Sequence, residues 1–580
     1  MKKVFALILA AVMIFSLAAC QTPETDEGGK TTDAASVTTK ANGGSTTEAA
    51  GTTAPDVPEE PVKLVIGIKN NTNVEDYKTN KFTTFLEEAC NVDLEFVVYS
   101  DDNSESASQL ALEIAGGEKL PDIIYDFRGI DDATRNEYGE DGYFVDLTEY
   151  LEDPEKMPNL WGRCKELMDE NDFIQLFELQ RDPSNGALYS IPTYEFSQGD
   201  RIEFYNFINK EWLEAVNMEV PTTVDELYDV LVAFRDQDPN GNGQKDEIPS
   251  ISYNKSSGGY RCDFAQYVIN AFVYCDDAYL FNATDGKVWV PYSTDEYREA
   301  LIYLNKLCSE GLFSDMSYSF TDYSEIQNIW TPSDGTAIAG IVGCHSSLGV
   351  AAGNMLISEY VGMGALEAET ELGGYAVWHA NSFRFNTFIT ESCENVDAAV
   401  RFLDYLFSRD ACIRMRYGEY GVEWTDAEEG ALSTMGLPAT ITNLDSSMWS
   451  KQSNACWHTV TGTCIYLPDM LASWVDLGAE DFASVRTNVF ITLYSAWSAG
   501  KVPDEVVYDL IYTAEENEMI SDLKTPYKQY VREARAQFTT GQLDPNNDRD
   551  WNNYLDTLKA LGEDTLVKNA QSSYTRMNGN

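Results

Sequence analysis

Six residues between positions 238 and 247 have the side-chain types and the spacing to bind a hard cation. Ca²⁺ takes six to eight oxygen ligands, and glycines let a short loop wrap tightly around it. The six residues are Asp238, Asn240, Asn242, Gln244 (through its backbone carbonyl), Asp246 and Glu247. Asp238, Asn240 and Asn242 match positions 1, 3 and 5 of an EF-hand-like loop. Position 12 falls on Pro249 and not on a glutamate, so we expect Glu247 to supply a carboxylate from beside Asp246.

Two other interpretations of this loop stay open. A second register starts at Asp236, with Glu247 at position 12. A polar Asn-Gly turn without an ion is the other interpretation, although the density of acid and amide side chains favours an ion. A capping box at 223–226 (TVDE) begins a predicted helix that runs into the loop, and no second helix follows it directly. The sequence therefore predicts a structural Ca²⁺ site and not a calcium switch.

The motifs of several enzyme classes are missing from the sequence. The three histidines, His345, His379 and His458, are not spaced as metal ligands, and no HExxH motif occurs. There is no GxSxG elbow, no Walker A loop and no dinucleotide-binding glycine motif. With 95 acidic residues, a pair of carboxylates at glycosidase spacing carries no information. We therefore expect a protein without catalytic residues.

The N-terminus predicts export and a lipid anchor. Lys2 and Lys3 precede a short apolar run, so residues 1–19 are typical of a secretory signal peptide. Small residues before Cys20 resemble the bacterial lipobox, which implies that Cys20 carries lipid in the mature chain. The alternative is ordinary signal cleavage beside an incidental cysteine. Residues 20–61 are rich in Thr, Ala, Ser and Gly, so we expect a disordered linker.

Charge and length limit the class of the remaining chain. The formal net charge of −55 argues against binding to nucleic acid or to anionic lipid. Roughly 520 residues exceed what one hydrophobic core supports, so we expect two lobes. No CxxC spacing occurs among the cysteines, so their disulfide state cannot be predicted.

The first part of the folded body alternates strands and helices. Residues 62–68, 94–98 and 121–125 have strand patterns, and helical patterns follow the first two of these segments. This order predicts a parallel sheet covered by helices. Ligands of such sheets bind at the carboxyl ends of the strands, here near 69–77 and 125–128.

Motifs along the whole mature chain resemble those of the extracellular solute-binding proteins of ABC importers. The similarity is greatest to the long Gram-positive lipoprotein branch linked with oligosaccharide uptake. The motifs are 146–150 (DLTEY), 157–160 (MPNL), 209–213 (NKEWL), 221–226 (PTTVDE), 238–243 (DPNGNG), 295–311 (DEYREALIYLNKLCSEG), 401–405 (RFLDY) and 538–561 (FTTGQLDPNNDRDWNNYLDTLKAL).

The resemblance implies a two-lobed, periplasmic-binding-protein-like (type II) α/β fold with the ligand in a cleft between the lobes. Lobe 1 is expected to comprise 62–195 with 384–437, and lobe 2, which carries the calcium loop, 196–383 with 438–580. The chain should cross between them near 192–199, 383 and 437–438. The resemblance also implies Ca²⁺ at the six loop residues named above.

The function implied by this resemblance is capture of a carbohydrate for delivery to an ABC permease. The expected carbohydrate is an oligosaccharide. The protein is then a monomer on the extracellular face of the cell membrane, held there by its lipid anchor alone. One alternative is a surface glycan-binding adhesin or scaffold, and another is a polysaccharide-degrading enzyme. A peptide or another solute also remains open as the ligand, because a fold does not fix the ligand.

Aromatic side chains in loop-like contexts are the candidate sugar contacts, because rings cover the apolar face of a sugar. Core packing is the alternative role for each of them. In contrast, Trp212 and Trp551 lie in helix-like motifs and are expected to be structural. The candidates are Tyr125, Trp330, Trp378, Trp424, Trp449 and Trp457.

Overall fold

The structure is a computed structural model. It describes residues 60–167, 177–178, 180–195, 205–253, 263–275, 280–320, 325–326, 329, 335–343, 355–376, 382–431, 438–444, 452–457, 482–501, 503–505, 507, 510 and 512–578. All of them lie in the second of the two units into which the chain divides, Pro58–Asn580. The predicted signal peptide and Cys20 lie outside the described residues, as does nearly all of the predicted linker.

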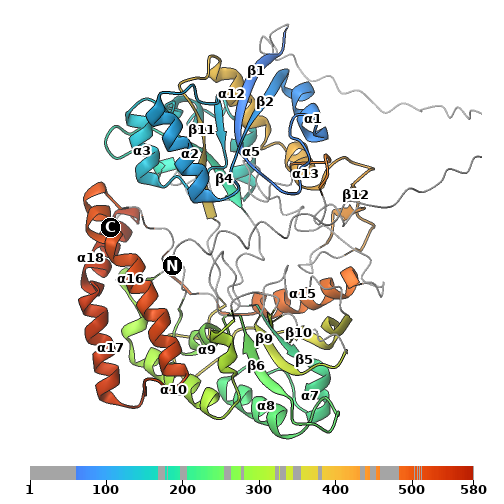
Figure 1. The fold of residues 1–580 in the computed structure, drawn as a ribbon, viewed down its shortest axis with the longest axis vertical. Coiled ribbons are helices and arrows are strands. Elements are labelled where there is room, and N and C mark those ends of the chain that lie inside the picture. The colour runs from blue at the N-terminus through green and yellow to red at the C-terminus, as the bar shows by residue number, and fades with distance from the viewer. Residues whose placement is uncertain are drawn as a thin grey trace, which may run out of the picture. The chain divides into compact units, whose positions relative to one another are not determined.

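The first sheet has five strands (Figure 1). Their order is β2 (Val92–Tyr99), β1 (Val62–Lys69), β3 (Ile123–Tyr125), β11 (Ser382–Ile389) and β4 (Ile191–Glu195). The strands β1, β2 and β3 are parallel, as the sequence predicts. In contrast, β11 comes from far along the chain and is antiparallel to both β3 and β4. The sheet is therefore mixed.

Both faces of the first sheet are buried. On β3, Ile123 and Tyr125 pack in one hydrophobic cluster, and Ile124 packs in another on the opposite face, because successive strand residues point to opposite faces. Helix α2, which ends at Gly116 before the left-handed cap Gly117, contributes to the second cluster. The helices of this part are α1 (Lys81–Cys90), α2 (Asn103–Gly116), α3 (Asp132–Glu140), α4 (Thr148–Leu151), α5 (Pro158–Leu167), α12 (Val396–Tyr405) and α13 (Arg409–Tyr417).

The second sheet has four strands in the order β10 (Tyr360–Gly362), β5 (Asn206–Asn209), β9 (Ala339–Gly343) and β6 (Ile248–Ser252). The strands β6 and β9 are parallel, whereas β5 is antiparallel to β9 and β10. The predicted capping box forms at Thr223 and Glu226 and starts the helix before the predicted calcium loop. Trp212 and Trp551 are buried here, which confirms their structural role.

The helices of the second core are α7 (Lys210–Val216), α8 (Val224–Asp236), α9 (Phe264–Phe272), α10 (Asp295–Ser309), α15 (Phe482–Ser498), α16 (Ala514–Thr539), α17 (Asp548–Ala560) and α18 (Glu563–Met577). The last three, in red in Figure 1, pack against one another. Short 3₁₀ turns lie at η2 (Pro291–Ser293), η3 (Asp315–Tyr318) and η4 (Met355–Glu359). There are also two antiparallel two-stranded ribbons in the described part of the chain. One consists of β7 (Asn282–Thr284) and β8 (Lys287–Trp289), and the other of β12 (Trp424–Asp426) and β13 (Ile441–Asn443).

The packing revises one boundary of the predicted lobes. Ile441 and Trp457, which the sequence places in lobe 2, belong to the first hydrophobic core. The segment before Trp457 is bonded there, because the backbone N–H of Lys81 donates to the Asn454 carbonyl and the Asn80 amide donates to the Cys456 carbonyl. Val489 belongs to the second core. We therefore extend lobe 1 to Trp457 and keep the rest of the division as a proposal.

Two further properties concern membrane-spanning helices and the cysteines. Among the described residues, no helix combines the length and the apolar character that crossing a membrane requires. Within the described part of the chain, Cys90, Cys164, Cys308 and Cys393 form no disulfide.

Candidate functional site

Polar side chains gather where the parallel strands of the first sheet end, which is the edge at which the sequence predicts ligand binding. The ammonium of Lys69, the last residue of β1, lies 2.6 Å from Oδ1 of Asn103. The Tyr77 hydroxyl donates to the Lys69 carbonyl at 3.0 Å. Because carboxyl ends of parallel strands collect ligands, this edge is the candidate ligand site of the first core.

Asp126 is the centre of this edge. It directly follows β3 and has a backbone φ of 55°, a left-handed conformation that Asp and Asn adopt more easily than most residues. Its Oδ1 accepts hydrogen bonds from the Asn386 amide at 2.6 Å and from Nε of Arg128 at 3.2 Å. The Arg128 side chain is 26% exposed, so the cluster presents a carboxylate, an amide and a guanidinium together, with the guanidinium reaching solvent.

Asn386 is a site residue that the sequence analysis did not identify. It lies on β11, which is antiparallel to β3, and its carbonyl accepts from the Phe127 N–H at 2.8 Å. In the sequence it is separated from Asp126 by 260 residues. No local pattern pairs them, because the pairing depends on the insertion of β11 into the sheet.

The predicted calcium loop forms a compact ring of hydrogen bonds after α8. Nδ2 of Asn242 donates to Oδ1 and Oδ2 of Asp246 at 3.1 and 3.2 Å. The N–H of Gly243 donates to Oδ2 of Asp238 at 3.0 Å, and Oδ1 of Asn240 accepts from the Asn242 N–H at 3.0 Å. Asp238, Gly241 and Gly243 have positive φ, which gives the loop its tight curvature. The structure thus brings the predicted side chains together.

Glu247 closes this loop from a more buried position. Burial raises the pKa of its carboxyl above the ordinary value, and the nearby carboxylates of Asp246 and Asp238 raise it further. Its Oε1 is buried and has no hydrogen-bond partner among the described residues. A buried oxygen without a partner is costly and is a position that a cation or a water would satisfy.

The register that starts at Asp236 is not supported by these contacts. The Asp236 carboxylate is held by the guanidinium of Arg235, at 2.9 Å from Nε and 2.8 Å from Nη2. No three acidic, histidine or cysteine side chains of the described residues converge as a metal-binding group. A cation here must therefore use the amide and carbonyl oxygens of Asn240, Asn242 and Gln244 as well as the carboxylates.

The structure changes the interpretation of three predicted aromatic contacts. Trp457 is fully buried, and its indole N–H donates to Oγ1 of Thr83 at 2.9 Å. Tyr125 is also fully buried, and Trp424 donates from its indole to the Gly418 carbonyl at 3.1 Å. All three rings belong to the first hydrophobic core. The remaining candidates, Trp330, Trp378 and Trp449, lie outside the described residues, as do the three histidines.

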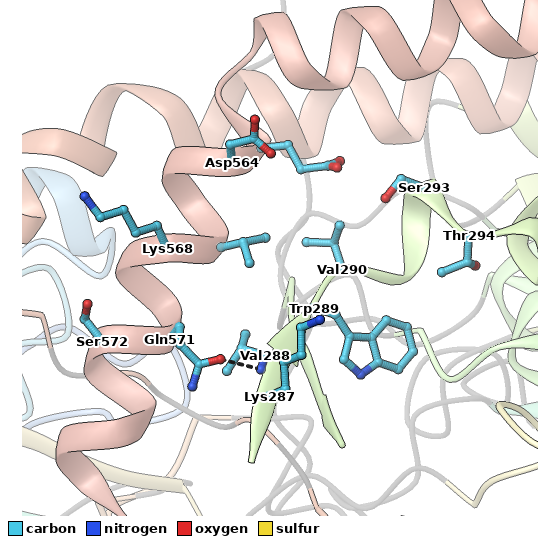
Figure 2. A pocket seen from close by; sticks show the side chains of 12 residues that line it. Lys287, Val288, Trp289, Val290, Ser293, Thr294, Asp564, Lys568, Gln571 and Ser572 are labelled. Carbon is cyan, nitrogen blue, oxygen red and sulfur yellow. Dashed lines mark hydrogen bonds between the residues drawn. The ribbon is translucent and has the colours of Figure 1, made fainter. Parts of the chain in front are cut away.

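A cavity of about 680 Å³ lies between the β7–β8 ribbon and α18. Figure 2 shows its side chains, with Lys568 and Gln571 on α18 and Lys287 and Val288 on β8. The Val288 N–H donates to Oε1 of Gln571 at 2.8 Å, which ties the ribbon to the helix. No strand of either main sheet ends in its lining, so we do not assign it as the principal ligand site.

Comparison with known proteins gives a relative that covers most of the chain. The fructooligosaccharide ABC transporter substrate-binding protein FusA of Streptococcus pneumoniae serotype 4 is 24% identical over 516 residues, which cover 85% of this chain and 86% of that protein.

Solved structures of similar proteins share the fold. The HMO-binding, ABC-transporter-associated solute-binding protein of Bifidobacterium longum infantis has a TM-score of 0.67 at 22% identity, with 89% of this chain and 99% of that chain covered. An EF-hand mutant of S. pneumoniae FusA in complex with fructo-nystose has a TM-score of 0.65 at 20% identity, covering 89% of this chain and 99% of that one. The two mixed sheets with separate cores thus correspond to the two-lobed α/β fold of solute-binding proteins, as predicted.

Residues 71–411 match the family described as bacterial extracellular solute-binding protein. This match covers more than half of the chain and confirms the resemblance seen in the sequence motifs. The chain belongs to the bacterial extracellular solute-binding proteins.

Proposed function

We propose that this chain is the substrate-binding lipoprotein of an ABC importer and that it captures a carbohydrate, an oligosaccharide above all, for delivery to a membrane permease. The observation that carries the proposal is the similarity to a fructooligosaccharide-binding protein over 85% of the chain. Family membership supports the extracellular location, and the related proteins are named for binding and not for catalysis.

The chemistry of the Asp126 cluster suits a sugar. A carboxylate accepts hydrogen bonds from hydroxyl groups, a guanidinium donates them, and an amide does both. Asp126, Arg128 and Asn386 supply these three groups within one hydrogen-bonded set. We infer that they bond the hydroxyl rim of the ligand and that no bond of the ligand is made or broken. Closure of the two lobes over the ligand then creates the surface that the permease recognises.

The anchor is part of the same proposal. Cys20 carries the lipid, and the residues from there to 61 separate the folded body from the membrane surface. The lipid is then the only membrane contact of a monomeric receptor. Radiolabelled palmitate incorporation that Cys20→Ser abolishes would support this assignment, whereas labelling that persists in the variant would contradict it.

We also propose a structural Ca²⁺ at the loop, held by Asp238, Asn240, Asn242, the Gln244 carbonyl, Asp246 and Glu247. The unpartnered Oε1 of Glu247 and the closeness of the Asn240 and Asn242 side-chain amides to the Asp246 carboxylate fit a site for a hard cation. A solved structure of an EF-hand mutant of FusA supports a site of this kind in a relative. When bound, the ion supplies positive charge that holds the loop closed, and it takes no part in ligand chemistry.

The test of ligand capture compares two aspartates on the same strand segment. Asp126 and Asp122 flank β3 at its two ends, and both are 8% exposed. Asp122 accepts from the Val65 N–H at 2.7 Å, at the end of β3 away from the candidate site. Calorimetric titration with kestose, nystose, human milk oligosaccharides and oligogalacturonides identifies the best ligand of the wild-type protein.

We expect Asp126→Asn to weaken binding of that glycan by about tenfold or more, from the loss of a charge-assisted hydrogen bond. Asparagine also tolerates the positive φ at this position. Asp122→Asn should change stability but leave the affinity within about twofold of wild type. Equal losses of affinity in both variants, or no binding of any glycan by the wild-type protein, would refute the assignment.

A further inference from the structure

Asn206, the first residue of β5, is fully buried, and neither its amide nitrogen nor its amide oxygen has a hydrogen-bond partner among the described residues. Burial of an amide costs free energy when its hydrogen bonds to water are lost and no other partner replaces them. Such groups in folded proteins are bonded to a buried water or to a ligand. Asn209, at the other end of the same strand, is equally buried but bonded, to the Trp212 N–H at 3.0 Å and to Glu359 at 3.1 Å.

Strand directions place Asn206 at the ligand-binding edge of the second sheet. The parallel strands β6 and β9 end at Ser252 and Gly343. Because β5 is antiparallel to β9, it begins at this edge, where Asn206 pairs with Gly343 and Gly343 pairs with Ser252. Residues paired across neighbouring strands project to the same face, so these three form one row. Gly343 contributes no side chain to that row.

The first sheet has the same arrangement. There, the antiparallel strand β11 places Asn386 beside Asp126 at the carboxyl edge of β1 and β3. The difference is that the Asn386 amide donates to a protein carboxylate, whereas the Asn206 amide has no such acceptor in the described part of the chain. The group that satisfies Asn206 therefore lies outside the described residues.

We propose that Asn206 is the ligand-binding residue of the second lobe and that it bonds a pair of neighbouring hydroxyl groups on the carbohydrate. A primary amide offers a donor and an acceptor side by side, and vicinal hydroxyls of a sugar offer the complementary pair. This assignment rests on the proposed function, since it needs a carbohydrate as the ligand. It makes the site two-sided, with Asp126, Arg128 and Asn386 on the first sheet and Asn206 on the second.

The experiment compares Asn206→Leu with Asn209→Leu, two substitutions of similar size on one short strand. Each variant is titrated calorimetrically with the glycan that binds the wild-type protein best, and each is melted without glycan. For Asn206→Leu we expect a melting temperature equal to or above that of wild type, because an unpaired buried amide is removed, and an affinity about tenfold or more weaker. For Asn209→Leu we expect a lower melting temperature and unchanged affinity.

Asn206→Asp adds a chemical control, since it keeps acceptors and removes the N–H donors. It should bind the glycan more weakly than the wild-type protein. Wild-type affinity in both Asn206 variants would overturn the assignment while leaving the proposed function intact. A wild-type protein that binds no glycan would overturn both.

Discussion

Removal of Ca²⁺ should lower the thermal stability of the second lobe, and the size of the effect can be worked out. A ligand present at a hundred times its Kd stabilises the folded state by about 2.7 kcal/mol. An unfolding entropy of about 2.1 cal/mol/K per residue gives about 0.65 kcal/mol/K for a lobe of about 310 residues. We therefore expect EDTA to lower the melting temperature of that transition by about 4 °C.

Paired variants make this experiment specific to the loop. Asp238→Asn combined with Asp246→Ala removes two carboxylates, and asparagine suits the φ of 50° at position 238. This double variant should melt at the same temperature with EDTA and with Ca²⁺. Asp236→Ala is the matched control, because Asp236 belongs only to the alternative register and is bonded to Arg235. It should keep the full response to EDTA.

The melting temperatures with Ca²⁺ and with EDTA are measured by differential scanning calorimetry of the mature protein, first with excess Ca²⁺ and then with EDTA. Identical melting curves for the wild-type protein under the two conditions would refute the proposed ion. Loss of the response in Asp236→Ala together with its retention in the double variant would show that the alternative register holds the ion instead.

Three further predictions concern packing and charge. Trp457→Ala should destabilise the first lobe by about 3–5 kcal/mol in denaturant unfolding, because a large fully buried ring is removed; a loss below about 1 kcal/mol would contradict its place in the core. Gly362→Ala should destabilise the second lobe by about 1–3 kcal/mol, since the new Cβ would lie 2.2 Å from Cα of Leu493; wild-type stability would show that β10 and α15 are not in close contact. Burial raises the folded-state pKa of Asp404 above its unfolded value, so its contribution to stability is greatest at low pH and is lost as the pH rises through the raised pKa. The unfolding free energy of Asp404→Asn relative to wild type should therefore increase between about pH 4 and pH 7, and parallel pH profiles would contradict this.

The features that the sequence predicts well are those determined by nearby residues. The capping box at Thr223 and Glu226 is confirmed, because its hydrogen bonds span only three residues. The ring of contacts around the calcium loop also involves residues that are close in sequence, so spacing alone identified its members.

The features that the sequence did not reveal depend on contacts between distant segments. The flanking residues of Trp457 are typical of a loop, but the ring packs against Tyr77, Phe82, Phe96 and Tyr125, which come from the start of the folded body. Its bond to Thr83 spans 374 residues. Local composition therefore favoured exposure, whereas tertiary packing buried the ring.

The same limit applies to the candidate ligand site. The strand pattern correctly placed the carboxyl edge of the first sheet near 125–128, because parallel strands end where their apolar alternation ends. It did not identify Asn386 or Asn206, since each lies on an antiparallel strand whose position in its sheet is determined by the whole fold. An asparagine at the end of a short apolar strand has no signal in sequence that separates a ligand contact from a helix cap such as Asn209.

The central claim is tested most directly by small-angle X-ray scattering of the mature protein with and without the glycan that it binds best. The glycan is recovered after the measurement and analysed. Capture between two closing lobes predicts a smaller radius of gyration in the presence of the glycan and recovery of the glycan unchanged. An unchanged radius at saturating glycan, as expected of an open scaffold, or recovery of shortened glycan products, as expected of an enzyme, would contradict the account.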